Sequence, residues 1–268
     1  MQWLSLVFFF IFTNLSAEIV KFTSASPFSF FDIVTSLDSH NEEIVFGELK
    51  FPDNKENKKY PLVIGVAGSL GWKEHHHDQL RIFREMGMAT FELQSFKSRG
   101  VISTVGTQTQ VTTATMILDS YRALDVLSLH PLIDNRNIAI TGWSLGGTVA
   151  LFSGWNTLIE TIKPMNKFSA HLSYYPLCIA IPENLDFTKS PIHILIGEED
   201  NWTPSNACEA FVSELNERDY NAGITVLKDS HHSFDSKLEL TKIEDGYSFV
   251  DCSFKIRDDG AVIMKPFR

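Results

Sequence analysis

The sequence predicts an α/β fold with a mostly parallel central sheet and helices on both faces. Short apolar runs rich in β-branched residues alternate with longer runs in which apolar residues recur every three or four positions. Strands that alternate with helices pair in parallel, and their right-handed crossovers place the helices over the sheet. The chain has 268 residues, of which 44% are hydrophobic, which is enough for one large core. We therefore expect a single domain over residues 18–268.

The expected elements follow one another in a regular order. Strands are predicted at 62–67, 88–93, 137–141, 170–174, 192–196 and 223–227, and helices at 78–86, 108–129, 145–154 and 205–217. The longest helix rests on the apolar spacing from Val111 to Leu127, and His130-Pro131 ends it. Residues 18–51 should add antiparallel strands at one edge, and a strand-like stretch, 254–264, closes the chain.

The N-terminus has the pattern of a signal peptide. Residues 3–12 form an apolar run, and small residues follow it up to Ala17. A membrane span needs roughly 20 apolar residues, about twice this run. We expect residues 1–17 to be removed, the mature chain to begin at Glu18 without a membrane span, and the protein to be exported, either periplasmic or secreted.

The charge balance bears on the partner. The formal net charge is −10, and no basic stripe is present to hold nucleic acid or an anionic membrane. We expect a small-molecule partner, while the oligomeric state stays open.

Three cysteines allow at most one disulfide. Cys178 and Cys208 each follow a predicted strand, so both should lie near one rim of the sheet, and in an oxidising compartment we favour this pair. Cys252 would then be a free thiol. The alternative is three reduced, buried cysteines.

The strongest chemical signal is Gly142-Trp143-Ser144-Leu145-Gly146-Gly147, which fits the GxSxG pattern between a predicted strand and a predicted helix. A serine at such a sharp turn projects from the sheet edge, and the helix N-terminus behind it favours developing negative charge. Ser144 is therefore the predicted nucleophile. A chance match in a glycine-rich turn is the alternative.

A serine nucleophile needs a histidine base and a carboxylate that orients the histidine. In this arrangement the chain order is serine, acid, histidine, and each partner follows a strand. Asp200 and His232 meet both conditions. Glu198 or Glu199 could replace Asp200, and His231 could replace His232.

The tetrahedral intermediate of such a reaction needs backbone N–H donors for its oxyanion. We expect Leu145 to supply one donor and the turn after strand 62–67 to supply the other, from Ser69 or Leu70. His75-His76-His77 could suggest a metal, but consecutive residues of a helix do not share a face. We interpret these histidines as a solvated helix entry and expect neither a metal nor a cofactor.

Several motifs in this order resemble the dienelactone hydrolase family of the α/β-hydrolase superfamily. They are Gly68-Ser69-Leu70-Gly71, 95–100, 142–147, 174–178, 197–208 and 231–235, and the resemblance runs from about Pro61 to Asp235. Family patterns favour Asp200 and His232 over their neighbours. Because the namesake enzymes carry cysteine where this chain has Ser144, the chain is similar to the serine-bearing relatives. The resemblance implies cofactor-free hydrolysis of an ester or lactone through an acyl-enzyme.

Three residues are candidates for substrate contact. Trp72 and Trp143 stand in the loops beside the predicted nucleophile, and Arg99 could bind a substrate carboxylate. Arg99 could equally brace its own loop by binding backbone carbonyls.

Two other functions remain open on the sequence. A serine peptidase of the prolyl-oligopeptidase kind shares the fold and the order of the three residues, although we expect no propeller domain before Leu62. A non-catalytic binding protein that kept the fold is the third possibility, and the complete set of three residues argues against it.

Overall fold

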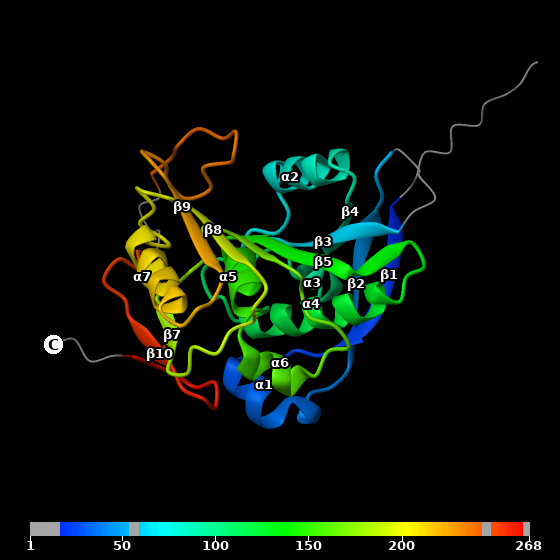
Figure 1. Ribbon diagram of the computed structural model, residues 1–268, viewed down its shortest axis with the longest axis horizontal. Coiled ribbons are helices and arrows are strands. Elements are labelled where there is room, and N and C mark those ends of the chain that lie inside the picture. Colours follow the sequence, from blue (N-terminus) through cyan, green and yellow to red (C-terminus); the bar gives the residue numbers. More distant parts are fainter. Residues whose placement is uncertain (1–16, 54–58, 243–247, 265–268) are drawn as a thin grey trace, which may run out of the picture.

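The computed structural model describes residues 17–53, 59–242 and 248–264 (Figure 1). Its centre is an eight-stranded sheet with the strand order β1-β2-β4-β3-β5-β6-β8-β9. These strands are β1 (Glu18–Ser24), β2 (Glu43–Lys50), β3 (Tyr60–Val66), β4 (Ala89–Leu93), β5 (Ile133–Trp143), β6 (His171–Tyr174), β8 (Ile192–Gly197) and β9 (Ala222–Leu227). Strands β1 and β2 are antiparallel to their neighbours, and all pairs from β4 to β9 are parallel. The predicted α/β fold is confirmed, and the antiparallel strands lie at one edge.

The helices connect the strands and cover the sheet. They are α1 (Phe30–Ser36), α2 (Glu74–Glu85), α3 (Ser95–Ser98), α4 (Thr113–Ser128), α5 (Leu145–Phe152), α6 (Asn156–Ile162) and α7 (Ser205–Asn216), with a short 3₁₀ turn at Leu37–Ser39. The sequence pattern predicted α2, α4, α5 and α7. It missed α1, α3 and α6, which have four to seven residues each, because so few residues cannot display a 3.6-residue period.

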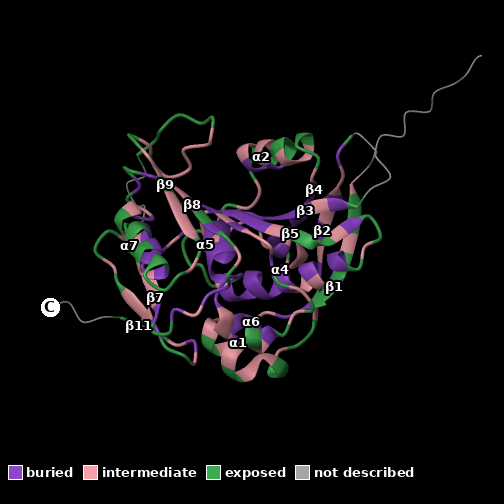
Figure 2. Ribbon diagram, in the orientation of Figure 1, coloured by how far each residue is buried: buried purple, intermediate pink, exposed green. Residues whose placement is uncertain are grey.

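The connections reverse direction beside β3. From β3 the chain moves through α2 to β4 on one side, and from β4 it returns through α4 to β5 on the other. This reversal places α2 on the opposite face of the sheet from α4 and α5, as Figure 1 shows. Figure 2 shows that the sheet and the inner sides of α4 and α5 form the buried layer. In open α/β sheets, ligands bind at the carboxyl ends of the strands beside such a reversal.

Two helix starts differ from the prediction. Helix α4 begins at Thr113 and not at residue 108, because the side chain of Thr112 caps the helix by accepting a hydrogen bond from the N–H of Thr115 at 3.2 Å. Helix α2 begins at Glu74, four residues before the predicted start. The histidines 75–77 therefore lie within its first turns; His76 is buried, contrary to the predicted solvated entry, whereas His77 is exposed.

The C-terminal stretch forms a second, small sheet. Strand β10 (Phe254–Ile256) pairs in parallel with β7 (Ala180–Pro182) and antiparallel with β11 (Val262–Met264). The strand-like character of this ending was predicted, whereas β7 was not.

The predicted signal peptide falls, for residues 1–16, outside the described part of the chain. Within the described ranges, none of the helices combines the length and the apolar character that a membrane crossing requires.

Candidate active site

Ser144 stands on a sharp turn between β5 and α5. Its backbone has φ 55° and ψ −113°, a strained region for a residue with a side chain. The turn is possible only because the flanking glycines let backbone segments touch. A Cβ on Gly142 would overlap the backbone of Gly146, and one on Gly146 would overlap the carbonyl of Val66. The GxSxG glycines thus serve close packing, and the serine hydroxyl is turned outward at the carboxyl end of β5.

The structure brings the three residues predicted for catalysis into one line of hydrogen bonds. Nε2 of His232 lies 3.0 Å from Oγ of Ser144, and Nδ1 of His232 lies 2.7 Å from Oδ2 of Asp200. An imidazole whose Nδ1–H donates to the carboxylate has its Nε2 free to accept the serine proton. The geometry therefore suits general-base activation of Ser144.

The acid lies in a turn that satisfies its carboxylate completely. Asp200 is 4% exposed. Its Oδ1 accepts hydrogen bonds from the backbone N–H groups of Trp202 and Thr203, both at 2.9 Å, and its Oδ2 accepts one from the hydroxyl of Thr203 at 2.7 Å. These three hydrogen bonds hold both carboxylate oxygens in a fixed orientation.

The alternative acid and base residues lie outside this line. The side chain of Glu198 accepts a hydrogen bond from the N–H of Asp229 at 3.1 Å, and Glu199 and His231 are exposed. Gly197 allows the two loops to meet, because a Cβ there would overlap the backbone carbonyl of Ser230. The turn after β8 and the loop after β9 are thereby held together.

The predicted oxyanion turn lies directly beside the nucleophile. A Cβ on Gly68 would be 3.6 Å from Cβ of Ser144, and Gly71, with φ +72°, closes the turn by donating to the carbonyl of Gly68 at 2.9 Å. Ser69 and Leu70 form the tip of this turn. Leu145 is the first residue of α5, so its N–H has no partner inside the helix. The three predicted donors thus belong to two backbone segments that flank Ser144.

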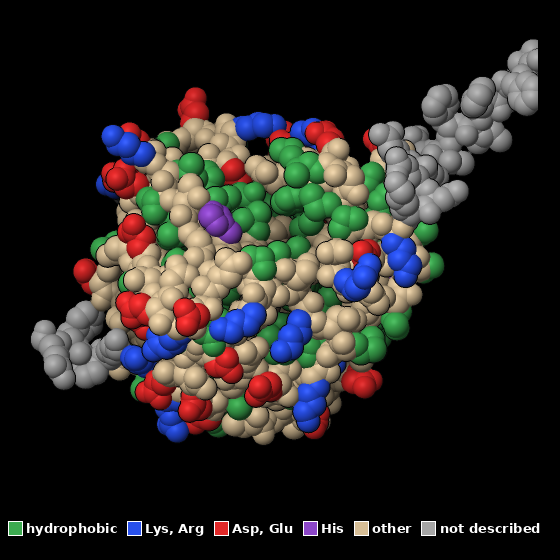
Figure 3. Space-filling model, in the orientation of Figure 1, with side chains coloured by type: hydrophobic (Ala, Val, Ile, Leu, Met, Phe, Trp, Pro, Cys, Tyr) green, Lys and Arg blue, Asp and Glu red, His purple; other side chains and the backbone are tan. Residues whose placement is uncertain are grey.

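A cavity of about 300 Å³ opens on the far side of this turn, at the carboxyl ends of β3 and β4. Its walls combine apolar side chains, among them Leu70, Trp72, Phe96, Val101 and Met116, with the polar side chains of Lys73, Gln94, Ser95 and Lys97. Figure 3 shows a different face, at the amino ends of the strands, where hydrophobic side chains gather around the position of α2 and a histidine lies beside them. We call this cavity the oxyanion-side chamber. Trp72, predicted to contact substrate, lines it.

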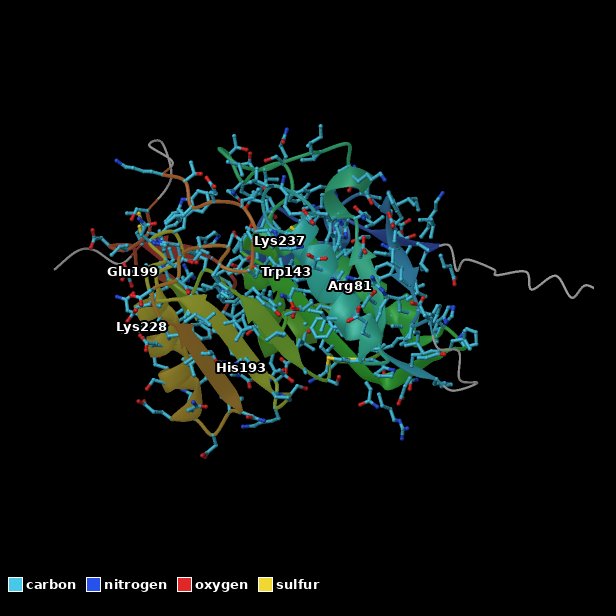
Figure 4. All side chains as sticks on the ribbon, turned by 90° about the horizontal axis from the view of Figure 1, so that it is seen from above. Arg81, Trp143, His193, Glu199, Lys228 and Lys237 are labelled. Atoms are coloured by element: carbon cyan, nitrogen blue, oxygen red, sulfur yellow. A yellow bond between two sulfur atoms is a disulfide. The ribbon has the colours of Figure 1, made fainter. Side chains whose placement is uncertain are left out.

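Trp143 does not line a binding site, contrary to the prediction. It is fully buried under α2, where its ring stacks on that of His76 with centroids 4.5 Å apart. Its Nε1–H donates to Oδ2 of Asp235 at 3.1 Å. Figure 4 labels Trp143 in the middle of the molecule. Residues of a strand alternate between faces, and this position points into the layer between the sheet and α2.

The first turns of α2 thus carry a buried histidine. Burial, together with the charges of the neighbouring histidines and of Lys73, lowers the pKa of His76 to about 2. His76 is a neutral packing residue at ordinary pH. Within the described residues, no group of three His, Cys, Asp or Glu side chains is arranged to hold a metal ion.

Arg99 is a brace and not a substrate contact, so the prediction of a binding role is wrong. Its guanidinium binds both oxygens of the buried Asp119, at 2.8 and 3.0 Å, and Oε2 of Glu43 at 2.7 Å. It also donates to the backbone carbonyls of Ala25 and Ser95. The arginine thereby ties the loop after β4 to the edge strands and to α4.

Cys178 and Cys208, the pair favoured by the sequence, form a disulfide, and Cys252 is free. The bridge joins the segment after β6 to α7. Both sulfur atoms lie near the carbonyl oxygen of Pro176, at 3.8 and 3.5 Å. It therefore fastens the backbone next to Tyr175 to the helix that follows the Asp200 turn.

Three further residues complete the site, and sequence reasoning assigned them no role. Thr203 donates to Asp200 and also lies 3.2 Å from Nδ1 of His232. The ring of Tyr175 lies 4.7 Å from that of His232, and its hydroxyl donates to Asp235 at 2.8 Å. Apart from the bond between Thr203 and Asp200, these contacts join residues 29 to 60 positions apart, and no local periodicity encodes them.

The comparisons with known proteins agree with this geometry. The model of the dienelactone hydrolase family matches residues 54–247. A "Putative Dienelactone Hydrolase" from Klebsiella pneumoniae superposes with a TM-score of 0.58 at 18% identity, over 85% of this chain and 93% of that one. The esterase Est2 from Thermogutta terrifontis superposes with a TM-score of 0.55 at 16% identity, over 71% of this chain and 79% of that one. None of the curated proteins matches the chain.

The structural neighbours share the fold of this chain, and the family match covers most of its length. The chain belongs to the dienelactone hydrolase family.

Proposed function

We propose that this protein is a serine hydrolase that cleaves a carboxylic ester or lactone through an acyl-enzyme. Membership of the dienelactone hydrolase family supports hydrolysis of this class of substrate. The observation that carries the serine mechanism is the continuous hydrogen-bonded line from Ser144 through His232 to Asp200.

The acylation step follows from this line. His232 accepts the hydroxyl proton of Ser144 on Nε2 while Oγ forms a bond to the substrate carbonyl carbon. The carbonyl oxygen becomes an oxyanion, which the N–H of Leu145 and one N–H from the Ser69–Leu70 turn stabilise. When the carbon–oxygen bond to the alcohol breaks, the imidazolium returns its proton to the departing oxygen. The acyl group remains on Ser144.

Deacylation repeats these steps with water. His232 takes a proton from the water as its oxygen bonds to the acyl carbon, and the imidazolium then protonates Oγ of Ser144 as the acid leaves. Asp200 keeps its charge throughout and stabilises the imidazolium that forms in each step. No cofactor is required by this sequence of bonds.

The position of the oxyanion-side chamber suggests which part of the substrate it takes. The departing alcohol must lie next to His232, which protonates it, and His232 follows β9. The chamber lies across Ser144 from that strand, at the ends of β3 and β4. We propose that the apolar side chains of this chamber receive the acyl group. The Thermogutta terrifontis esterase of the same fold has been captured with propionate and with butyrate bound.

A panel of aryl esters of increasing acyl length tests this function. We expect kcat/KM to rise from acetate to butyrate or hexanoate, because each buried methylene contributes about 0.8 kcal/mol. The variant Val101→Phe should narrow the chamber and reverse that preference, with acetate hydrolysis retained. Folded protein that hydrolyses no ester of the panel, and cleaves only peptide substrates, would contradict the proposal.

We further propose that the protein is exported, either to a periplasm or to the medium. The apolar run at residues 3–12, the small residues up to Ala17 and the disulfide support this, because disulfides persist in oxidising compartments. Intact-mass measurement of the protein from its native cells should give a chain that begins at Glu18. A cytosolic protein that retains residues 1–17 would contradict export.

A further inference from the structure

His232 stands on a segment without regular secondary structure. After β9 ends at Leu227, the described chain runs through turns and irregular backbone to residue 242. An imidazole that must meet Ser144 within a few tenths of an ångström needs support beyond its single bond to Asp200. The loop itself supplies some of this support, because Ser233 adopts φ +59° and its carbonyl accepts from the N–H of Ser236 at 2.9 Å.

Asp235 ties this loop to the nucleophile strand. Its Oδ2 accepts a hydrogen bond from Nε1–H of Trp143, the residue that directly precedes Ser144. Trp143 is fully buried and held between His76 and Tyr174, whose rings lie 4.5 and 5.4 Å away. The carboxylate of Asp235 therefore takes its position from a rigid part of the sheet.

Asp235 also holds the ring that packs on the base. Its Oδ1 accepts from the hydroxyl of Tyr175 at 2.8 Å, and the ring of Tyr175 lies 4.7 Å from that of His232. The backbone of Tyr175 is fixed as well, because its N–H donates to the carbonyl of Leu195 and its own carbonyl lies 3.2 Å from the hydroxyl of Thr203. Burial, and then the charge of Asp235, raises the pKa of Tyr175 above its usual value, so the hydroxyl keeps the proton that it donates.

We propose that Asp235 is a positioning residue that clamps the His232 loop to the Ser144 turn through Trp143 and Tyr175. This role rests on the proposed serine hydrolase function. Asp235 touches neither the substrate nor the reacting atoms. It acts by keeping Nε2 of His232 at hydrogen-bond distance from Oγ of Ser144, and its carboxylate is suited to this because its two oxygens accept from two different donors at once.

The first test compares Asp235→Asn with Asp235→Ala on an aryl ester. An amide has one acceptor oxygen in place of two, so we expect Asp235→Asn to lower kcat by about tenfold to a hundredfold and Asp235→Ala to lower it further. KM should change by less than about twofold, because the clamp does not contact substrate. The rate at which a fluorophosphonate modifies Ser144 should fall in parallel with kcat.

The second test removes one of the two hydrogen-bond donors to Asp235. Tyr175→Phe removes one hydrogen bond to Asp235 and leaves the ring on His232, and it should lower kcat by about tenfold. Its effect should not add to that of Asp235→Ala, because the alanine variant already lacks the acceptor for the Tyr175 hydroxyl. Tyr220→Phe is the matched control: it removes a similar tyrosine bond, to Asp186 at 3.0 Å, away from the site, and should leave kcat unchanged.

These measurements distinguish a role of Asp235 in positioning His232 from a role in the stability of the fold alone. If Asp235→Asn and Tyr175→Phe keep the wild-type kcat, or lose activity only in proportion to unfolded protein, the clamp is overturned. If the wild-type chain neither hydrolyses esters nor reacts with the fluorophosphonate, the proposed function fails first, and the clamp fails with it.

Discussion

The carboxylate of Asp200 accepts a hydrogen bond from His232 at 2.7 Å, whereas the side chain of Glu199, its neighbour in sequence, is exposed. Figure 4 labels Glu199 near the edge of the molecule. The turn closed by Trp202 and Thr203 draws the side chain of Asp200 inward, and the backbone N–H of Glu199 is used to bind the carbonyl of Ser230. Two adjacent carboxylates therefore have opposite environments.

Because the two carboxylates lie in different environments, removing the charge of Asp200 should lower kcat strongly, whereas removing the charge of Glu199 should leave kcat almost unchanged. Asp200→Asn keeps the size of the side chain but favours the wrong tautomer of His232, and kcat should fall by about 10⁴-fold. Glu199→Gln should change kcat by less than about twofold, as exposed substitutions usually do. Steady-state kinetics on one aryl ester measures both. Equal losses in the two variants would contradict the assignment of the acid.

The network around Arg99 predicts a loss of stability without a change in substrate preference. Arg99→Ala leaves the fully buried carboxylate of Asp119 without its bidentate partner, which should cost about 3–5 kcal/mol of unfolding free energy. Arg136→Ala, at a side chain that is 85% exposed and pairs with Asp134, should cost at most about 1 kcal/mol. Urea denaturation gives both values. A stable Arg99→Ala protein with a raised KM would restore the role in substrate binding.

Buried histidines predict that the protein loses stability in acid. The pKa of His76 is lowered by burial to about 2 and that of His171 to about 4, below the value of about 6.5 expected in the unfolded chain. Below pH 6.5 the unfolded state therefore binds protons that the folded state does not, and the stability that is full above this pH declines as the pH falls. Each histidine can contribute a slope of up to about 1.4 kcal/mol per pH unit.

The substitution His76→Asn isolates one of these contributions. An amide oxygen can replace Nδ1 as the acceptor for the N–H of Lys73, and it does not titrate. Between pH 6.5 and pH 4 the unfolding free energy of the variant should depend less steeply on pH than that of the wild type. His193→Asn, at an exposed ring on β8, is the control. An unchanged slope in His76→Asn would show that His76 is not the source.

Loss of the disulfide should lower the stability of the fold, although the bridge takes no part in the reaction. Replacing both Cys178 and Cys208 by serine opens a loop of 30 residues, which should lower the unfolding free energy by about 3–4 kcal/mol in the chain-entropy account. Cys252→Ser should have little effect. Thermal melting with and without reductant tests this, and a wild-type protein whose melting temperature ignores reductant would contradict it.

Much of the fold and the central residues of the site could be predicted, because both are encoded locally. The alternation of apolar runs gave the parallel strands, and the glycines around Ser144 exist for a turn that only closely packed backbone allows. The order of Ser144, Asp200 and His232 follows from each lying after a strand of the same sheet. Register within a loop, as between His231 and His232, needed the structure or a resemblance to decide it.

What could not be predicted depends on contacts between distant segments. Trp143 was expected at the substrate because it adjoins the nucleophile, but the alternation along β5 turns it toward α2 and Asp235. Arg99 was left between two roles, and the buried Asp119, 20 residues away on α4, decided for the brace. The short helices α1, α3 and α6 show no periodicity of their own and depend on the packing around them.

The role of Ser144 as the nucleophile is tested most directly by treating the folded protein with an activated fluorophosphonate and locating the adduct by peptide mass spectrometry. We expect one adduct, on Oγ of Ser144, that is absent in Ser144→Ala and forms far more slowly in His232→Ala. Folded protein that stays unmodified, or an adduct on another residue that persists in Ser144→Ala, would contradict this role.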